Sequence, residues 1–421
     1  MKISVLIDES TTLSRKSTLV IVIRTYFEDY PSGAYVFNLD LIELTNTTSE
    51  SITNQLLSCL HKHGFEQTFL KECFIASACD GASVMLGKNK GVAKRLQSIF
   101  PNLVIWHCSN HRLELAVNDC VNEVCGINHF KIFIDKIYSL YNQSPKNQNE
   151  LRQAAANLET QLLKIGRILS VRWVASSRRT VNAIIHNYQA LGLHFDNASI
   201  DPTRDTRERA KYDGLKKYLS STDFVKNLTL FADALDELAA LSEQLQKQNM
   251  NLTQADRAVR VTIRVLESMA TTPGPKFADG LRSIQETSSY RGIKLHDGKV
   301  VPINPAQFFT SLANNLKNRL ISVSSSNTTT TNYDNDMNVK TYMNLLESIK
   351  VLEPTHWPKN NDGAVVNITY GDNEVRNMCK LFHLNHYENQ IIHGFRTYKM
   401  CEEKDEIPDD LKPLLKAVAT I

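Results

Sequence analysis

The chain has 421 residues, of which 42% are hydrophobic and 22% are charged, and its formal net charge is +3. This length exceeds what one core usually takes, so we expect two or three domains. A charge this close to neutral gives no argument for nucleic-acid binding by itself, so any basic surface must be local. No stretch has the apolar length of a membrane-spanning helix. The eight cysteines include no CxxC pair, which favours a reducing compartment, the nucleus or the cytosol.

The first part of the chain alternates between strand and helix signals. Apolar and β-branched runs predict strands over 3–8, 18–26, 34–44, 73–79 and 103–107. Apolar residues at helical spacing predict helices over 49–64 and around 92–99. The resulting order, β-β-β-α-β-α-β, places three antiparallel strands before βα units, as in the ribonuclease H-like fold. We therefore expect an α/β protein with a mixed sheet over residues 1–125.

From about residue 126 the sequence becomes helical. Helix candidates cover 130–141, 150–169, 224–247, 255–270, 340–350, 372–383 and 386–399. The clearest is 224–247, where apolar residues repeat at three-four spacing and Asp233, Asp236 and Glu237 lie off that face. A polar tract over 324–338 predicts a loop. We expect a helical insertion over 126–400 and the start of a return to the sheet domain over 401–421.

Two aspartates follow strand signals. Asp8 ends the first strand and Asp80 follows the fourth. In a ribonuclease H-like sheet these strands are neighbours, so the carboxylates would converge and need a hard cation, Mg²⁺ or Mn²⁺, between them. Such ions activate water and stabilise the leaving oxygen in phosphodiester cleavage. Each aspartate alone is better explained as the cap of a turn, but the pair in this strand order favours a catalytic metal site.

Cys108 and His111 have CxxH spacing directly after the fifth strand. Half a zinc site of this kind would need two more ligands. The nearest unclaimed set is Cys379, His383, His386 and His393. Because no partner has regular finger spacing, zinc is the less favoured interpretation. A helix start in which the cysteine packs and the histidine makes a hydrogen bond is the favoured one.

Arg172 and Trp173 lie in SVRWVASSRR, in which Arg178 and Arg179 follow. An indole can stack on an unpaired base while guanidinium groups hold phosphate, so this string is a candidate DNA-binding site. Alternatively, Trp173 anchors helix packing and the arginines form a solvated face. The residues alone favour this alternative.

Together these clusters resemble the hAT superfamily of DNA transposases and its domesticated, zinc-finger-associated descendants. The matching strings, in the family's order, are IDEST, CDGASVMLGKNKGV, HCSNHRLELAV, SVRWVAS and the segment 351–375. The resemblance covers nearly the whole chain. It implies a DDE-type catalytic core that cleaves DNA through a hairpin and then transfers a strand. It also implies that Asp8 and Asp80 bind metal and that Arg172 and Trp173 contact the transposon end, Trp173 by stacking on a flipped base.

The chain also departs from the family pattern. The family's third acid, a glutamate, lies in a C-terminal block that includes the dimerisation region, and DDLKPLLKAVATI resembles the sequence just upstream of it. Neither Glu374 nor the acids at 402–406 match this block. The family's N-terminal BED-type zinc finger has no counterpart either. We therefore expect a chain truncated at both ends, with part of its sheet uncovered, that has lost cleavage activity and dimerises only if the missing block is supplied.

These features predict a nuclear, nucleic-acid-binding protein with DNA or nuclear proteins as partners and no membrane association. One alternative is a domesticated interaction module in transcription or SUMO conjugation, with helices at 224–270 as the partner surface. The other is a metal-dependent nuclease that takes a third acid from elsewhere and loses activity in Asp8→Ala. A basic stripe with salt-sensitive binding would combine the arginines of SVRWVASSRR with Lys88, Lys90, Lys94 and Arg95.

Overall fold

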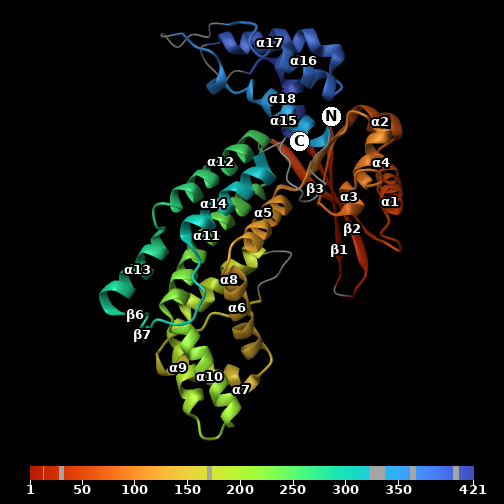
Figure 1. Cartoon of the computed structure of the whole chain (residues 1–421). Coiled ribbons are helices and arrows are strands. Elements are labelled where there is room, and N and C mark those ends of the chain that lie inside the picture. The colour runs from red at the N-terminus through yellow and green to blue at the C-terminus, as the bar shows by residue number, and fades with distance from the viewer. Residues whose placement is uncertain (13, 28–32, 168–172, 322–336, 361–366, 402–406) are drawn as a thin grey trace. The chain divides into compact units, whose positions relative to one another are not determined.

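The computed structural model describes all residues except 13, 28–32, 168–172, 322–336, 361–366 and 402–406. The chain divides into two compact units (Figure 1). Unit 1 contains the main sheet and consists of Met1–Arg112, Leu245–Arg257 and Val323–Ile421. Unit 2 is largely helical and consists of Leu113–Gln244 and Ala258–Ser322. The protein is therefore α/β, as predicted, with a helical unit inserted into the unit that carries the sheet.

Five strands of unit 1 form a mixed sheet in the order β3-β2-β1-β4-β5. The strands are β1 (Ile3–Thr11), β2 (Ser17–Tyr26), β3 (Ala34–Glu43), β4 (Phe74–Cys79) and β5 (Val104–His107). β1 and β3 each pair antiparallel with β2, whereas β4 pairs parallel with both β1 and β5. The five strand predictions are confirmed, although β1 continues three residues beyond Asp8.

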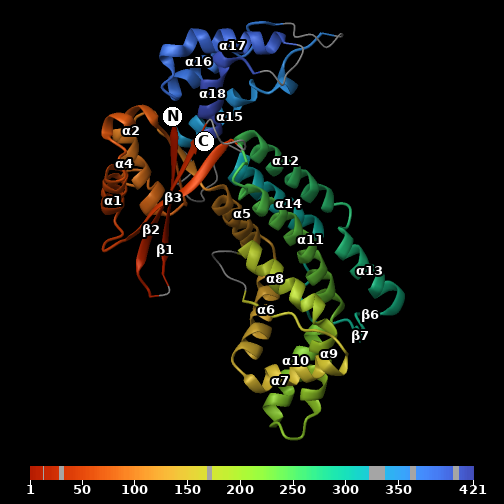
Figure 2. The same cartoon turned by 180° about the vertical axis from the view of Figure 1, so that it is seen from behind.

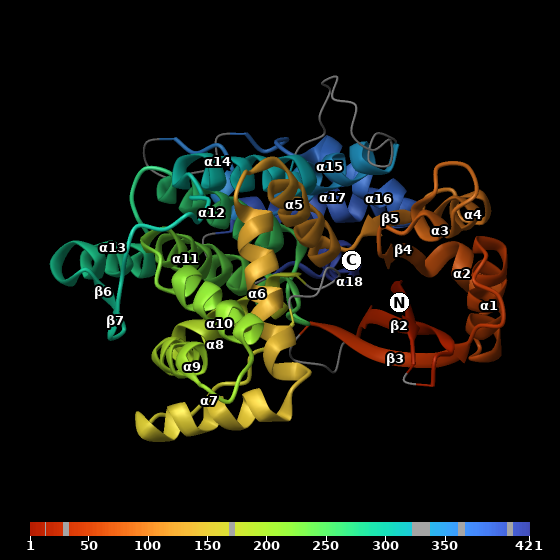
Figure 3. The same cartoon turned by 60° about the horizontal axis from the view of Figure 1, so that its bottom comes forward.

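Helices α1 and α4 pack on one face of the sheet, which we call the first face. The helices on this side are α1 (Ser49–Lys62), α2 (Gln67–Cys73), α3 (Ser83–Leu86) and α4 (Val92–Ile99) (Figure 3). Ile7 of β1 and Ile21 of β2 are buried in one core with Leu56 of α1 and Leu96 of α4. The helices predicted over 49–64 and 92–99 are confirmed as α1 and α4.

The second face of the sheet packs against helices from the end of the chain (Figures 1 and 2). These are α15 (Met337–Lys350), α16 (Asp372–Leu381), α17 (Glu388–Met400) and α18 (Lys412–Thr420), with 3-10 turns η2 (Pro354–His356), η3 (Asn385–Tyr387) and η4 (Asp409–Leu411). α15 contacts β5, α18 contacts β2, and Arg24 Nε of β2 donates to the carbonyl of Ala419 at 3.1 Å. β2 and β5 are therefore covered on this face, whereas Leu6 of β1 is 36% exposed there, so the predicted exposure is limited to part of the sheet.

The boundary of the helical insertion also differs from the prediction. The sequence placed 126–400 in the insertion, but the helices from residue 337 onward belong to unit 1. Their buried residues share one core with Ile75 and Val104 of the sheet. Most of the predicted polar loop over 324–338 lies outside the described residues, and its last two residues, Met337 and Asn338, begin α15.

Unit 2 is formed by helices and one short hairpin. The hairpin joins β6 (Ser289–Tyr290) to β7 (Ile293–Lys294), and a π-helical turn, η1 (Lys317–Ile321), follows the last helix. The helices are α5 (Ser109–Glu123), α6 (Ile127–Asn142), α7 (Pro145–Asn157), α8 (Trp173–His186), α9 (Tyr188–Ile200), α10 (Thr206–Leu219), α11 (Thr222–Leu245), α12 (Leu252–Met269), α13 (Pro275–Thr287) and α14 (Pro305–Leu316). α5 and α12 each begin in unit 1, before the unit boundary.

The helix predicted over 150–169 starts and ends earlier than expected. α7 begins at Pro145, and the side chain of Ser144 accepts a hydrogen bond from the backbone N–H of Asn147. Serine before proline is a strong helix-start signal because proline lacks the N–H group that the first turn leaves unpaired. α7 ends at Asn157, and the residues over 158–167 are not helical.

The helix predicted over 224–247 is confirmed as α11, but its polar face is not fully exposed. Asp233 is buried, and its carboxylate accepts backbone N–H groups of Lys276 at 3.0 Å and Phe277 at 2.8 Å at the start of α13. Because most residues of α11 from Phe224 to Leu241 are buried, this helix contributes little to the partner surface over 224–270 that the interaction-module alternative predicts.

Candidate metal centre and nucleic-acid interface

Asp8 lies in β1, and Asp80 directly follows β4, the parallel neighbour of β1. The parallel register ends where Leu6 of β1 pairs with Ala78 of β4, and two further residues along each segment lead to Asp8 and Asp80. Because side chains alternate along a strand, Asp8 lies on the face opposite Ile7, which is buried against α1. The strand order therefore puts both predicted ligands toward the carboxyl ends of two neighbouring parallel strands, and their convergence on a metal stays a prediction.

Asp80 also holds the turn that follows β4. Its Oδ1 accepts a hydrogen bond from the backbone N–H of Ala82 at 3.1 Å, which is the geometry of an Asx turn. The turn interpretation of Asp80 is thus confirmed. It is compatible with metal binding because it uses one carboxylate oxygen and fixes the direction of the other.

The rings of His107 and His111 lie against the backbone next to Asp80. Their centroids are 5.3 Å apart, and a Cβ atom at Gly81 would come within 2.6 Å of His107 Nε2 and 3.0 Å of His111 Cδ2. A side chain at position 81 would therefore displace both rings. Gly81 therefore permits close packing of the two rings against the backbone.

The two aspartates fit a sparse site for a hard cation. Mg²⁺ commonly keeps several waters and is held by one or two carboxylates together with substrate phosphates. Within the described parts of the chain, no group of three or more candidate ligands includes Asp8 or Asp80. Such a group needs ligand atoms of His, Cys, Asp or Glu that all lie within 4.8 Å of one another, and none of this kind forms around either aspartate among the described residues. The acids at 402–406 lie outside them.

Cys108 and His111 stand at the start of a helix, as the favoured interpretation requires. Cys108 precedes the first residue of α5, and its backbone N–H donates to the carbonyl of Cys79 at 2.8 Å. Cys379, a member of the possible second half-site, is buried in the second-face core, and burial raises the pKa of its thiol to about 12. Neither Cys108 nor His111 belongs to a three-ligand group among the residues that the structure describes.

Trp173 is a packing residue in this conformation. It is the first residue of α8, its side chain is 5% exposed, and its ring centroid lies 6.2 Å from that of Phe231. It lines an apolar cavity of about 10 Å³ with Phe308 and Leu312, far too small for a nucleobase. Its indole N–H finds no acceptor among the described residues. Stacking on a flipped base, which the family resemblance implies, would require the ring to leave this core.

Glu114 holds the start of the helix that carries Trp173. Its Oε2 accepts backbone N–H groups of Trp173 at 2.8 Å and Val174 at 3.2 Å. A carboxylate at this place bonds unpaired N–H groups and complements the helix dipole. Burial raises the pKa of Glu114, and the two backbone hydrogen bonds oppose that rise. Sequence reasoning missed this residue, although it belongs to the string HCSNHRLELAV.

The arginines near Trp173 differ in their availability to a phosphate. Arg172 lies outside the described residues. Arg178 Nε lies 2.9 Å from Asp236 Oδ1 and its Nη1 lies 3.2 Å from Glu243 Oε1, so two carboxylates of α11 compensate its charge. Arg179 is exposed and donates through Nε to the carbonyl of Ala175 at 3.3 Å. Within the described part of this string, Arg179 is the better candidate for a phosphate contact.

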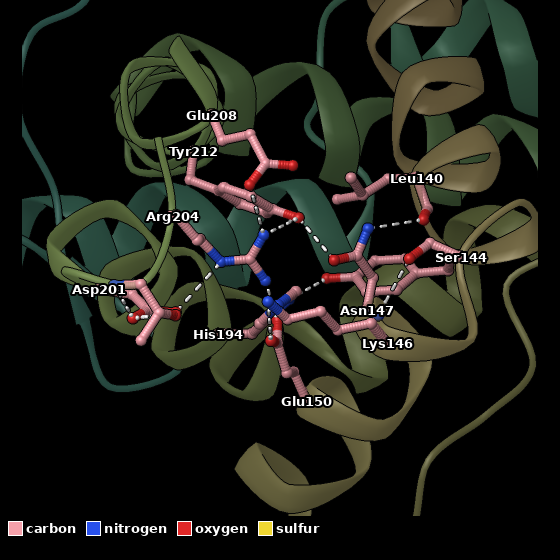
Figure 4. A network of polar contacts seen from close by, with 12 residues as sticks. Leu140, Ser144, Lys146, Asn147, Glu150, His194, Asp201, Arg204, Glu208 and Tyr212 are labelled. Carbon is pink, nitrogen blue, oxygen red and sulfur yellow. Dashed lines mark hydrogen bonds and ion pairs between the residues drawn. The ribbon is translucent and has the colours of Figure 1, made fainter. Parts of the chain in front are cut away.

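The sequence did not reveal a polar network inside unit 2 (Figure 4). His194 lies between Tyr141, whose hydroxyl is 2.8 Å from Nδ1, and Glu150, whose Oε2 is 2.9 Å from Nε2. Glu150 also pairs with Arg204, whose guanidinium lies 4.6 Å from the ring centroid of Tyr212. The network joins α6, α7, α9 and the start of α10. Its members bond one another, so its role is structural.

No protein-family model matches the sequence. The described helices also include none that is long and apolar enough to cross a membrane. In the described residues, Asp8 lies in β1, Asp80 follows its parallel neighbour β4, Arg179 is exposed and Trp173 is buried.

Proposed function

We propose that this chain derives from a hAT-type transposase with a ribonuclease H-like core, and that it binds nucleic acid in the nucleus without efficient phosphodiester cleavage. One observation carries the proposal: β1, which contains Asp8, is the parallel neighbour of β4, which Asp80 directly follows, in a sheet ordered β3-β2-β1-β4-β5. Antiparallel strands followed by parallel βα units are the arrangement expected of a ribonuclease H-like sheet. The order of the strings that contain Asp8, Asp80, His111 and Trp173 supports the same origin.

Asp8 and Asp80 would hold Mg²⁺ or Mn²⁺ in this function. Such an ion neutralises phosphate charge and, in an active nuclease, makes a bound water nucleophilic. The chain's own contribution is to position the carboxylates. β1 fixes Asp8 within a strand paired on both sides, and the bond from Ala82 to Asp80 fixes the second carboxylate.

The proposed loss of cleavage follows from the ligand count. A two-ion mechanism needs enough oxygen ligands to place one ion on the attacking side and one on the leaving side. Among the described residues, no compact group of three His, Cys, Asp or Glu side chains includes Asp8 or Asp80. With two carboxylates, the expected behaviour is weak metal binding that strengthens when a phosphate completes the coordination.

Exposed basic residues support nucleic-acid binding in both units. Arg179 is exposed in unit 2, and Lys90 and Lys94 are exposed in unit 1. Arg95 is less available because its guanidinium lies 3.4 Å from Glu50 Oε2. Contacts of this kind address the phosphate backbone, so binding should weaken as salt rises and should carry little sequence preference.

The first test is calorimetric titration of Mn²⁺ into the purified chain and into an Asp8→Asn/Asp80→Asn double variant. We expect saturable binding that the double variant loses. Glu9→Gln is the matched control, because Glu9 is adjacent in β1 and points to the other face. Binding that persists in the double variant, or no binding by a chain shown to be folded by circular dichroism, would overturn the two-aspartate site.

The second test separates binding from cleavage. Fluorescence anisotropy with labelled single-stranded and duplex DNA should show salt-sensitive binding, and gels with Mn²⁺ present should show no cleavage. Mn²⁺-dependent cleavage that disappears in Asp8→Ala would establish the nuclease alternative instead. Failure to bind either DNA at low salt would exclude the nucleic-acid function and favour the protein-interaction module.

A further inference from the structure

Asp40, Cys59 and His63 form a compact cluster in unit 1. Asp40 Oδ2 lies 3.1 Å from His63 Nε2 and 3.8 Å from Cys59 Sγ, and one ligand atom from each residue lies within 4.8 Å of the others. Metal–ligand bonds of about 2.0–2.3 Å in a tetrahedral zinc site put neighbouring ligand atoms roughly 3.3–3.8 Å apart. The cluster therefore already has nearly the dimensions of a metal site.

Helix α1 and its C-terminal cap supply two of the three side chains of this cluster, Cys59 and His63. Cys59 and His63 are four residues apart at the end of α1, and the backbone N–H of His63 donates to the carbonyl of Cys59 at 3.1 Å. This bond keeps helical geometry as far as His63, so both side chains lie on one face of the helix. That face points to the sheet, because Cys59 is buried in the first-face core.

A β-bulge turns the third side chain toward the helix. Along β2 and β3, Ile21 pairs with Asp40 but Val22 pairs with Asn38, so Leu39 is an extra residue on β3. Before the bulge Phe37 and Leu39 pack against the first-face core, and after it Ile42 does. Without the bulge the alternation would place Leu41 inside and Asp40 outside. Instead Leu41 is 63% exposed, and the side chain of Asp40 lies on the same face of the sheet as that of Ile42.

We propose that Asp40, Cys59 and His63 bind a divalent transition-metal ion of the zinc class, with the fourth coordination position open to solvent. Thiolate, imidazole and carboxylate are the ligand types that zinc takes in proteins, and three protein ligands with one open position is a recurring arrangement. One thiolate and one carboxylate compensate the charge of the ion. The imidazole of His63 and the carboxylate of Asp40 are part-exposed, which provides an entry path.

One cation already lies near the cluster. Lys62 Nζ is 3.8 Å from Asp40 Oδ2, but the lysine side chain is 74% exposed and can move into solvent when a metal binds. Without metal, Asp40 ties β3 to α1 through its contacts with His63 and Cys59. The hydrogen bond from His63 lowers the pKa of Asp40, so this carboxylate is ionised and ready to coordinate.

Metal binding must displace a proton from Cys59. Burial, and then the charge of Asp40, raise the pKa of this thiol, so it is protonated at neutral pH when no metal is present. The S–H bond breaks, the sulfur–metal bond forms, and one proton passes to solvent. At pH values below the pKa of the thiol, the affinity for the metal should therefore increase about tenfold for each unit by which the pH rises.

The test is titration of Co²⁺ into the full chain with a non-thiol reductant, followed by displacement with Zn²⁺. Thiolate coordination gives a charge-transfer band in the near ultraviolet, and tetrahedral Co²⁺ gives intense visible bands. We expect one thiolate-bound Co²⁺ per chain, loss of the charge-transfer band in Cys59→Ser, and affinity weakened at least about tenfold in His63→Gln. Because His63 is at the surface, His63→Gln remains informative if Cys59→Ser fails to fold.

Two controls separate this site from others in unit 1. Cys73→Ser removes a different part-buried thiol and should leave the spectrum unchanged. Asp8→Asn/Asp80→Asn removes both aspartates of the predicted Mg²⁺ or Mn²⁺ site and should also leave it unchanged, so this proposal and the proposed function fail independently. Absence of the charge-transfer band in the unaltered chain, or a band that survives Cys59→Ser and His63→Gln, would overturn the assignment.

Discussion

Oε2 of Glu114 lies 2.8 Å from the backbone nitrogen of Trp173, so a side chain of α5 caps α8 across 59 residues of sequence. The bond connects two of the strings that the sequence singled out for chemistry. Both strings therefore have a structural role. The carboxylate of Glu114 in α5 helps to hold the start of α8, and with it Trp173, in the core of unit 2.

Replacing Glu114 by alanine should destabilise unit 2. The substitution leaves the N–H groups of Trp173 and Val174 without their acceptor, and the loss of a helix cap costs about 0.5–2 kcal/mol of unfolding free energy. Chemical denaturation monitored by tryptophan fluorescence measures the loss. Glu114→Gln keeps one acceptor oxygen and should lose less, and equal stability of Glu114→Ala and the unaltered chain would show that water replaces the cap at no cost.

The sheet was predictable because its residues repeat with a strand period and their buried faces are apolar. Ile7 and Ile21 belong to runs in which β-branched residues dominate, and those runs became β1 and β2. The prediction that Asp8 and Asp80 lie together depends on strand order alone. The structure confirms that β1 and β4 are parallel neighbours, and the metal site itself stays a prediction.

The bulge in β3, the burial of Asp233 and the cap formed by Glu114 could not be predicted, because each depends on contacts between residues that are distant in sequence. The bulge at Leu39 breaks the alternation of β3, and a simple period of two would have placed Leu41 in the core and left Asp40 outside. Asp233 looked like a surface acid of an amphipathic helix until the start of α13 packed against it. The same holds for Glu114, whose partner is far away in sequence.

Trp173 and Arg179 should separate stability from nucleic-acid binding. Trp173→Ala removes a buried indole and should cost about 3–5 kcal/mol of unfolding free energy. Arg179→Ala removes an exposed cation and should change stability by less than about 0.5 kcal/mol. In contrast, Arg179→Ala should weaken DNA binding. It should also lower the slope of the logarithm of the binding constant against the logarithm of the salt concentration by about one.

Arg178→Met provides the comparison for that experiment. Its guanidinium is held by Asp236 and Glu243, so its removal should affect DNA binding less than the removal of Arg179. Anisotropy titrations at several salt concentrations measure both variants. A larger loss for Arg178→Met than for Arg179→Ala would mean that DNA binding breaks these ion pairs, contrary to our assignment.

His194 should make the stability of unit 2 depend on pH. Burial lowers its pKa below the ordinary value of 6.5, and the charge of Arg204 acts in the same direction while Glu150 opposes it. Between the folded-state pKa and 6.5 the unfolded chain therefore binds more protons than the folded chain. It follows that the free energy of unfolding falls as the pH drops through 6.5, and that it is regained as the pH rises above this value.

Urea unfolding at pH ~7.5 and ~5.5 measures this effect. His194→Asn should be less stable at both values, because Tyr141 and Glu150 lose their partner, but its stability should change less between them. His129→Gln is the control, since His129 is exposed on α6 and should leave the pH dependence intact. An unchanged pH dependence in His194→Asn would assign the effect to other groups.

Lys399 should stabilise unit 1 through hydrogen bonds to the backbone. Its buried ammonium donates to the carbonyls of Ile368 and Tyr370, and its Nζ lies 4.3 Å from the ring centroid of Phe395. Lys399→Met keeps the apolar stem but leaves both carbonyls without this donor, which should cost about 1–3 kcal/mol of unfolding free energy.

Denaturation curves of Lys399→Met and of Lys380→Met provide the measurement and its control. Lys380 is an exposed residue of α16 in the same unit, so its substitution should leave the midpoint nearly unchanged. Burial lowers the pKa of Lys399 to about 8, while Asp372 opposes that change, so the ammonium remains charged near neutral pH and donates to both carbonyls. A Lys399→Met variant as stable as Lys380→Met would mean that the cost of burying the charge cancels the gain from its hydrogen bonds.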